Sequence, residues 1–264
     1  MAETDLNTIE DERPRKLHWE WTLPTFLHPK KTLSLVAAQE KGVWFTPLLI
    51  LSILAIVFVL ISAPTRTQTI QNQAGASQPP DGFEYWAPEQ QEQWFQSQSN
   101  KSGPLFVYVF PALSELGEIW IGWVLLGSIL NLSLILNGSR GNGTTLLNIT
   151  GWAFLPFAIR YLVRIISVLT THQLIGSPGL SGLIAADASG FLMFLRPVLA
   201  HIDFYFLWMV ALLIIGVMPV AGLKRTKVIF AILFSVLIVL ALQALPGYTA
   251  SKLGNLSLSG GFFF

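Results

Sequence analysis

The chain has 264 residues, of which 52% are hydrophobic and only 12% are charged, and it contains no cysteine. Because soluble domains carry about 25% charged residues, this composition excludes an ordinary soluble protein and, with long apolar runs, indicates an integral membrane protein. The formal net charge of +1 gives no sign of a nucleic-acid-binding surface. The lack of cysteine excludes disulfides, thiolate metal sites and a cysteine nucleophile.

Five apolar segments are long enough to cross a bilayer, which takes about 20 residues as a helix. They cover residues 44–63, 117–136, 149–170, 198–220 and 227–245. The first 43 residues are polar and charged, so we expect no cleavable signal peptide, and the first span reads as an uncleaved signal anchor. We therefore predict an all-α fold, a polytopic bundle of five membrane-spanning helices within residues 44–245.

Lysine and arginine predict the orientation of these spans, because both are enriched in cytoplasmic loops. Ten of them fall in the N-terminal region and in the turns after the second and fourth spans, whereas four fall on the opposite side. This distribution predicts a cytoplasmic region over residues 1–43 and an extracytoplasmic tail over residues 246–264. The membrane is expected to be the cell membrane, with a eukaryotic endomembrane as the alternative.

Two regions outside the spans have a character of their own. Within residues 22–43, apolar residues recur at helical spacing after Pro29, and Lys30 and Lys31 are placed to face anionic headgroups, which predicts a short interfacial helix. Residues 64–104 form a polar extracytoplasmic loop rich in Gln, Ser and Pro, which favours a solvated, partly disordered linker. Aromatic residues in this loop give the alternative that part of it lies on the membrane surface or on a partner.

The residue types that carry catalysis are not spaced for it. The four histidines are scattered, and none has a Glu or a second His at the spacing of a helical zinc site, so we expect no metal and no cofactor. Ser128 and Ser133 are of the type an intramembrane serine enzyme needs, but serines in membrane helices usually serve packing. The Gly-rich turn 137–145 lacks the Gly-Lys-Ser/Thr ending of a phosphate-binding loop. No catalytic residue is predicted.

The ionisable residues inside the spans form the candidate site, because a charge at the membrane centre costs about 2.5–3.5 kcal/mol on insertion scales. Arg160 and Arg164 lie four residues apart, on one face of the third span. At a rise of ~1.5 Å per residue, Arg164 is about as deep as Asp203 of the fourth span, and Glu118 of the second span is within reach. Pro156, one turn before Arg160, predicts a kink in the helix.

Three interpretations of Arg160, Arg164, Glu118 and Asp203 stay open. The first is a structural ion-pair lock between helices, since buried charges are normally paired. The second is a site for a lipid headgroup or a substrate anion, in a water-filled groove that opens outward. The third is a pair of snorkelling arginines without partners.

Three stretches of the sequence follow a familiar order. FLHPKKTLSLVAAQEKGVWFTPLLIL leads through a Pro-basic pair into the first span, and GNGTTLLNITGWAFLPFAIRYLVRI is a Gly-rich turn before a span with a central proline. HIDFYFLWMVALLIIGVMPVAGLKRTKVIFAI joins an Ile-Asp and a Trp to a basic turn and the last span. Together they resemble the bacterial branch of the Ypt-interacting protein (YIP) family, over about residues 26–248.

The resemblance implies a five-helix membrane protein with a cytoplasmic N-terminus and no known catalytic residues. Bacterial members look like accessory membrane subunits, some of them linked to ABC-type export systems. Eukaryotic members are associated with Rab-type GTPases, but their Asp-Leu-Tyr-Gly-Pro motif is missing near the first span here, which argues against GTPase binding.

We therefore expect a non-enzymatic accessory or scaffold subunit of a membrane complex. Its expected partners are the lipid bilayer and other membrane proteins, among them ABC transporter subunits, whereas no nucleic acid is expected. The alternative function is a transporter, or a lipid- or anion-binding permease, that uses the two arginines. An intramembrane enzyme is the weakest alternative, because the sequence offers no base, nucleophile or ligand set for one.

Overall fold

The computed structural model describes residues 17–76, 79, 82–100, 103–185 and 187–259. All regular structure within these residues is helical, which confirms the predicted fold class. The helices are α1 (Thr22–Leu27), α2 (Pro29–Ala37), α3 (Phe45–Ala76), α4 (Pro88–Asn100), α5 (Phe110–Leu136), α6 (Gly143–Ala153), α7 (Pro156–Thr171), α8 (Phe191–Ala200), α9 (Phe204–Val217) and α10 (Arg225–Ser259).

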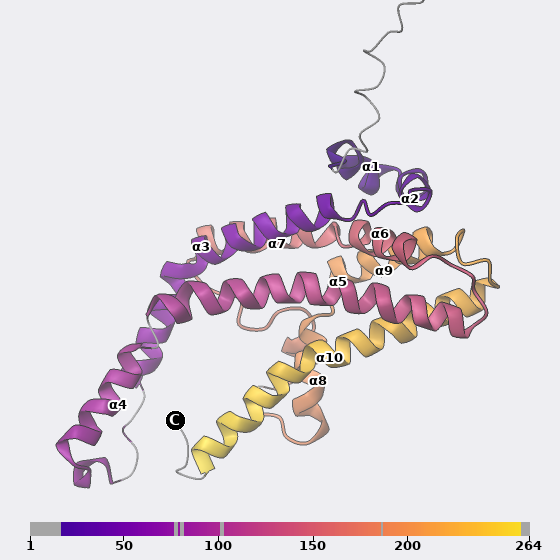
Figure 1. Cartoon of the computed structure of the whole chain (residues 1–264). Coiled ribbons are helices and arrows are strands. Elements are labelled where there is room, and N and C mark those ends of the chain that lie inside the picture. Colours follow the sequence, from indigo (N-terminus) through magenta and orange to yellow (C-terminus); the bar gives the residue numbers. More distant parts are fainter. Residues whose placement is uncertain (1–16, 77–78, 80–81, 101–102, 186, 260–264) are drawn as a thin grey trace, which may run out of the picture.

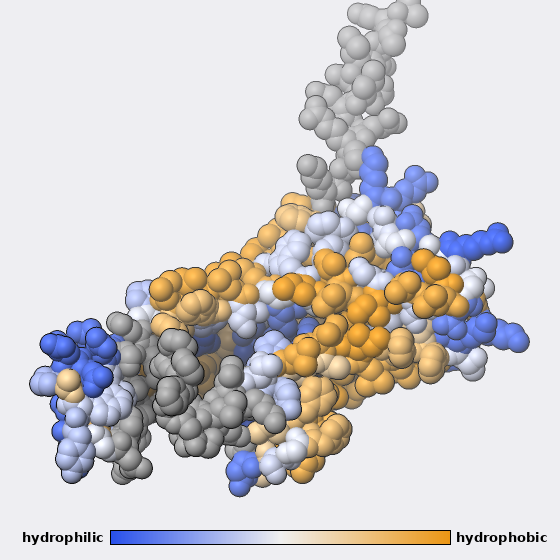
Figure 2. Space-filling model, turned by 60° about the horizontal axis from the view of Figure 1, so that its bottom comes forward, coloured by the Kyte–Doolittle hydropathy of each residue, from blue (hydrophilic) through white to orange (hydrophobic). Residues whose placement is uncertain are grey.

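Within the described part of the chain, four stretches are long and apolar enough to cross a membrane, namely Phe45–Asn72, Leu105–Leu136, Gly143–Thr171 and Arg225–Thr249. Helices α8 and α9 add a fifth if they count as one span, although they are bent by 73°. Apolar side chains cover the body of the molecule and hydrophilic ones gather at its two ends (Figure 2). Exposed apolar side chains such as Leu60, Ile121 and Ile166 suit contact with lipid. The chain is a multi-pass membrane protein.

The long helices lie along one another, with α1 and α2 at one end of the bundle (Figure 1). Helix α4 extends from the opposite end, and α10 finishes toward that end. Because α1 and the end of α10 lie at opposite ends, the arrangement fits an odd number of crossings, which the bent pair α8–α9 completes if it counts as one span. Helix α3 packs mainly on α7, and α5 packs on α6 and α10.

Two spans are broken, the third beside Pro156, where the sequence predicts a kink, and the fourth where the sequence predicts a continuous helix. The third is interrupted at Phe154 and Leu155, and Pro156 occupies the start of α7, where its missing N–H and fixed φ are tolerated. The fourth leaves helical conformation between Ala200 and Phe204, where the side chain of Asp203 accepts a hydrogen bond from the Phe206 N–H (2.8 Å) and caps α9. This cap fixes the sharp bend between α8 and α9.

The other differences are extensions of helices. The second span begins at Leu105, well before Gly117, because the π-helical stretch Leu105–Val109 leads directly into α5. Helix α10 continues past residue 245 to Ser259 with Pro246 inside it, so residues 246–259 belong to the last helix rather than to a separate tail.

The segment 64–104 is largely helical rather than a disordered linker. Helix α3 runs through its first part, where the hydroxyls of Thr67 and Thr69 donate to carbonyls one turn earlier. The second part contains α4, and the ring of Phe83 packs against those of Trp94 and Phe95 at centroid distances of 5.2 and 5.6 Å. These aromatic contacts supply packing that polar composition alone does not reveal.

At the opposite end, α2 lies across α6 and α9 and buries Leu33 and Val36. The amide of Asn148, which is fully buried, accepts from the Val43 N–H (2.8 Å) and donates to the Lys41 carbonyl (2.9 Å). The indole of Trp152 donates to the Val43 carbonyl (3.0 Å). We call these contacts of Asn148 and Trp152 the neutral joint, because they tie the segment before α3 to α6 without any charge.

Candidate functional site

The site lies where α5, α7 and the turn between α8 and α9 meet. Arg160 on α7 donates through Nε to Asp203 Oδ2 at 2.6 Å and through Nη2 to the carbonyl of His201 at 3.2 Å. The side chains of Arg160 and Asp203 are 17% and 21% exposed, so the pair is mostly removed from solvent. One arginine thus holds both the carboxylate and the backbone of the bend.

Arg164, one turn along α7, pairs with a different helix. Its two terminal nitrogens donate to the two oxygens of Glu115 on α5, at 3.0 and 3.2 Å. The hydroxyl of Tyr161 donates to the same carboxylate at 2.7 Å. This two-pronged geometry is the strongest arrangement that a guanidinium and a carboxylate can form, and it fastens α7 to α5.

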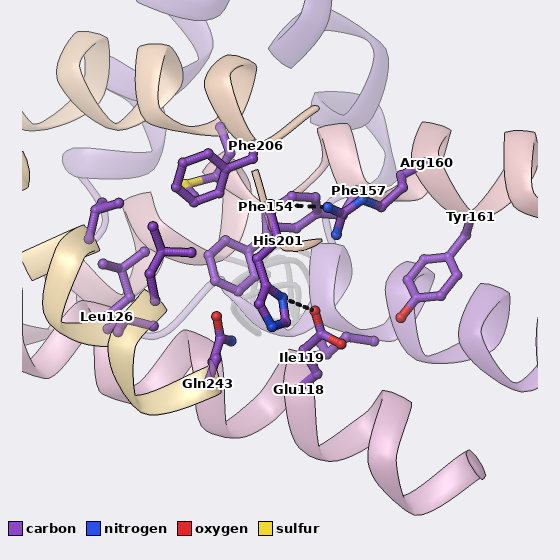
Figure 3. A pocket seen from close by; sticks show the side chains of 14 residues that line it. Glu118, Ile119, Leu126, Phe154, Phe157, Arg160, Tyr161, His201, Phe206 and Gln243 are labelled. Carbon is purple, nitrogen blue, oxygen red and sulfur yellow. Dashed lines mark hydrogen bonds and ion pairs between the residues drawn. The ribbon is translucent and has the colours of Figure 1, made fainter. Parts of the chain in front are cut away.

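Glu118 has a partner that the depth estimate does not predict. Its Oε1 lies 3.4 Å from Nδ1 of His201 rather than beside an arginine (Figure 3). The side chain of Glu118 is 40% exposed, more than any other acid of the site. We call Glu115, Glu118, Arg160, Arg164, His201 and Asp203 the charged cluster.

Each of the two arginines also contacts an aromatic ring. The guanidinium carbon of Arg164 lies 4.0 Å from the centre of the buried Phe58 ring on α3, and that of Arg160 lies 5.0 Å from the Phe157 ring. Such cation–π contacts stabilise a partly desolvated guanidinium. Two arginines are therefore accommodated in an apolar helix because each has an ion pair on one side and a ring on the other.

A cavity of about 400 Å³ adjoins the charged cluster and includes all six of its members in its wall. Arg66 on α3 adds a third guanidinium, and the apolar part of the wall includes Phe58, Val163 and Ile175. A second, narrower hollow of about 50 Å³ continues from Glu118 and His201 toward apolar side chains such as Phe206 (Figure 3). The larger volume falls in the range of small-molecule sites.

The loop between α7 and α8 closes one side of the cavity, and Gly179 positions it. This glycine has φ +57°, and a Cβ at its position would lie 2.7 Å from the carbonyl oxygens of Leu199, Ala200 and Ile202. The next N–H, that of Leu180, donates to the carbonyls of Leu199 and Ile202 at 2.9 and 3.1 Å. The loop thereby satisfies carbonyls left open at the end of α8, and only glycine fits there without strain.

The structure brings all four predicted site residues to one place, but with different partners. Arg160 meets Asp203, while Arg164 meets Glu115, which sequence reasoning missed because the second span was started at Gly117. The available signal was the spacing of Glu115 and Glu118, which puts two acids on one helical face. His201 was not proposed because the four histidines lack the spacing of a helical metal site, whereas the structure places it in the bend beside Asp203.

The chemistry of this arrangement is charge pairing and hydrogen bonding. Across the described ranges, no group of three or more His, Asp or Glu side chains is placed to hold a metal ion. The hydroxyls in the cavity wall are those of Tyr205 and Ser177, and neither contacts a base among the described residues. The site can therefore hold helices together or accept a charged ligand.

Comparison with known proteins identifies the family. The family model of the Yip1 domain matches residues 24–245. The chain belongs to the Yip1 family. This confirms the predicted YIP membership, while the bacterial branch stays a prediction. The matched range contains α2, the neutral joint, the whole charged cluster and the spans up to residue 245 of the last one. No curated protein and no solved structure matches the chain.

Proposed function

We propose that this Yip1-family protein is a non-enzymatic accessory or scaffold subunit of a membrane complex, for which an ABC-type export system of a bacterial cell membrane is the leading candidate. The export system and the bacterial branch rest on the sequence resemblance alone. Lysine and arginine distribution supports a cytoplasmic N-terminus and an extracytoplasmic C-terminus.

The observation that carries the proposal is the pairing of charges within the bundle. Arg160 and Arg164 each donate hydrogen bonds to a carboxylate outside α7. The nitrogen–oxygen distances are 2.6 Å to Asp203 and 3.0 Å to Glu115. Groups held this way fasten helices, because breaking a buried pair leaves an uncompensated charge. A protein whose intramembrane charges serve its own fold acts most directly through its surface, on neighbours in the membrane.

Partner capture by site-specific photocrosslinking tests the proposal. A photoreactive residue is placed at outward apolar positions on different helices, Leu60, Ile121 and Phe230, and at the buried position Leu33 as the matched control. We expect one face to crosslink to an integral membrane transport component identified by mass spectrometry, and deletion of the chain to lower transport by that component. Equal crosslinking to lipid alone from every face, with transport unchanged after deletion, would contradict the proposal.

A permease is the second candidate, and the cavity of about 400 Å³ lined by three arginines favours it. The purified chain, reconstituted alone in vesicles, should then show saturable flux or lipid transfer that Arg66→Gln reduces. A silent vesicle assay, with the same preparation still crosslinking to its partner, leaves the accessory role standing.

A further inference from the structure

The charges that line the cavity are equal in number but not all paired. Three arginines and three acids face it, and histidine counts as neutral. Arg160 with Asp203 and Arg164 with Glu115 form two ion pairs. Outside these two pairs, the wall of the same cavity carries one cation, Arg66, and one anion, Glu118, whose Oε1 lies 3.4 Å from His201 Nδ1.

Arg66 makes few polar contacts within the described part of the chain. Its one hydrogen bond among the described residues is from Nη2 to the Ser62 hydroxyl at 3.5 Å, the outer limit for such a bond, and no described carboxylate lies within 4.0 Å of it. Glu115 attracts it over a longer distance, but both oxygens of that carboxylate are engaged by Arg164 and Tyr161. A half-buried guanidinium with open donors favours a negatively charged oxygen group.

Glu118 is the opposite case. Among the described residues, its one polar partner is a histidine nitrogen at 3.4 Å, and 40% of its side chain is exposed although it lies within a membrane span. A carboxylate has about four acceptor positions, so most of its capacity faces the cavity. This group favours a cationic donor such as an ammonium.

The surroundings suit an amphiphile rather than a fully polar ligand. Phe58, Val168 and Leu174 contribute apolar wall, and Val163 and Ile175 are about half exposed, so the cavity reaches the apolar outer surface of the bundle. A headgroup inside the cavity can then stay attached to chains that lie along the lipid-facing helices.

We infer that the cavity binds a zwitterionic headgroup, with an anionic group such as a phosphate at Arg66 and a primary ammonium at Glu118. A simple anion leaves Glu118 unpaired and repels it, and a simple cation does the same to Arg66. The site acts independently of the partner protein proposed above. The ligand is an aminophospholipid of the bilayer or a soluble molecule with the same phosphate-and-amine headgroup.

Native mass spectrometry of the full chain in detergent tests the inference with two lipids of identical acyl chains. One is phosphatidylethanolamine, which carries both charges, and the other is phosphatidylglycerol, which carries only the negative one. We expect the wild-type chain to favour phosphatidylethanolamine about tenfold, the scale of one hydrogen bond to a charged group. Glycerophosphoethanolamine as competitor separates the sources: displacement of the lipid indicates a headgroup site open to soluble ligands, and no displacement indicates a lipid site.

Three variants complete the test. Glu118→Gln should abolish the preference between the two lipids, Arg66→Gln should weaken both by roughly tenfold, and Arg140→Gln, at the other end of the bundle, should change neither. Thermal unfolding midpoints check that each variant is folded, and Glu118→Gln, which keeps the shape of the side chain, carries the result if Arg66→Gln fails to fold. Equal or tighter binding of phosphatidylglycerol to the wild type, or variants that behave like Arg140→Gln, would overturn the inference.

Discussion

The protein holds its apolar helices together at two polar regions of opposite kind. The neutral joint at one end is dry: Asn148 and Trp152 are 0% exposed and bond to the backbone of Lys41 and Val43. The charged cluster toward the other end is built of ion pairs, and its arginines remain 17% and 31% exposed beside a cavity of about 400 Å³. The neutral joint is closely packed, whereas the charged cluster borders an open cavity.

The difference shows what each kind of bond is suited to. A neutral amide that satisfies two backbone groups costs little to bury, so it can lock the segment before α3 tightly against α6. Burying a charge in a helix bundle costs little free energy only when the charge is paired or solvated. The ion pairs therefore lie beside a polar cavity. The neutral joint therefore only fastens helices, whereas the charged cluster fastens helices and also borders a polar cavity.

The largest expected effect is at the ion pair of Arg160 and Asp203. Arg160→Ala should lower the free energy of unfolding by about 3–5 kcal/mol, because it leaves a mostly buried carboxylate without its partner. Asp203→Ala should cost a similar amount, since it also removes the cap of α9. Unfolding by SDS titration in mixed micelles, followed by tryptophan fluorescence, measures both.

A double-mutant cycle separates this pair from its neighbourhood. The double variant Arg160→Ala/Asp203→Ala should be less destabilised than the sum of the single variants by about 1–3 kcal/mol, as contacting residues are. Arg164→Ala with Asp203→Ala is the matched control, because Arg164 pairs with Glu115, and its two effects should be closer to additive. Additive effects in both cycles would show that Arg160 and Asp203 do not form a lock.

The neutral joint gives the second effect. Asn148→Leu should destabilise the protein by about 2–4 kcal/mol, because it leaves the Val43 N–H and the Lys41 carbonyl unpaired in a buried site. Asn131→Leu is the control: its Oδ1 is buried without a partner among the described residues, so the same change should be neutral or slightly stabilising. The same unfolding titration serves, and equal losses at both positions would show that side-chain size, not bonding, decides.

The sequence could predict the features that depend on local residue patterns, such as the membrane spans and the helix face shared by two residues. Uninterrupted apolar runs identify the spans, because a bilayer demands a minimum length. The spacing of Arg160 and Arg164 puts them on one face, and counting rise per residue sets Arg164 near the level of Asp203, although it is Arg160 that pairs with Asp203 in the structure. For Pro156 the sequence predicts a kink within one helix, whereas the structure begins a new helix, α7, at this residue.

What could not be predicted depended on where helices begin and bend. Glu115 was excluded by a span boundary set on hydropathy, and a turn of helix more or less decides whether an acid lies in the membrane. The bend at Asp203 arises from a cap bond and from carbonyl contacts with the distant loop at Gly179, and neither leaves a periodic signal. Those two facts decide the partners of Arg164 and Glu118.

The third effect is expected at the loop that closes the cavity. Gly179→Ala should lower the free energy of unfolding by about 1–3 kcal/mol, since φ is +57° and the added Cβ meets three carbonyl oxygens at 2.7 Å. Gly182→Ala is the control in the same loop, because the nearest atom to its Cβ would be the Ser177 Cβ at an ordinary 3.6 Å. Gly179→Ala should also weaken lipid binding at the cavity. Equal losses of stability in Gly179→Ala and Gly182→Ala would show that the α7–α8 loop does not hold the bend between α8 and α9.

The smallest effect tests how much of the charged cluster is held by hydrogen bonds other than ion pairs. Tyr161→Phe removes the hydroxyl that donates to Glu115 at 2.7 Å and leaves the two bonds from Arg164 in place. The free energy of unfolding should fall by about 1–2 kcal/mol, the scale of one hydrogen bond to a charged group that keeps its other partners. Tyr205→Phe is the control: Tyr205 lines the same cavity as Glu115 but has no hydrogen bond within the described part of the chain, so the free energy of unfolding should change by less than about 0.5 kcal/mol. If both changes are silent, Arg164 alone determines the position of Glu115, and the attachment of α7 to α5 rests on one ion pair.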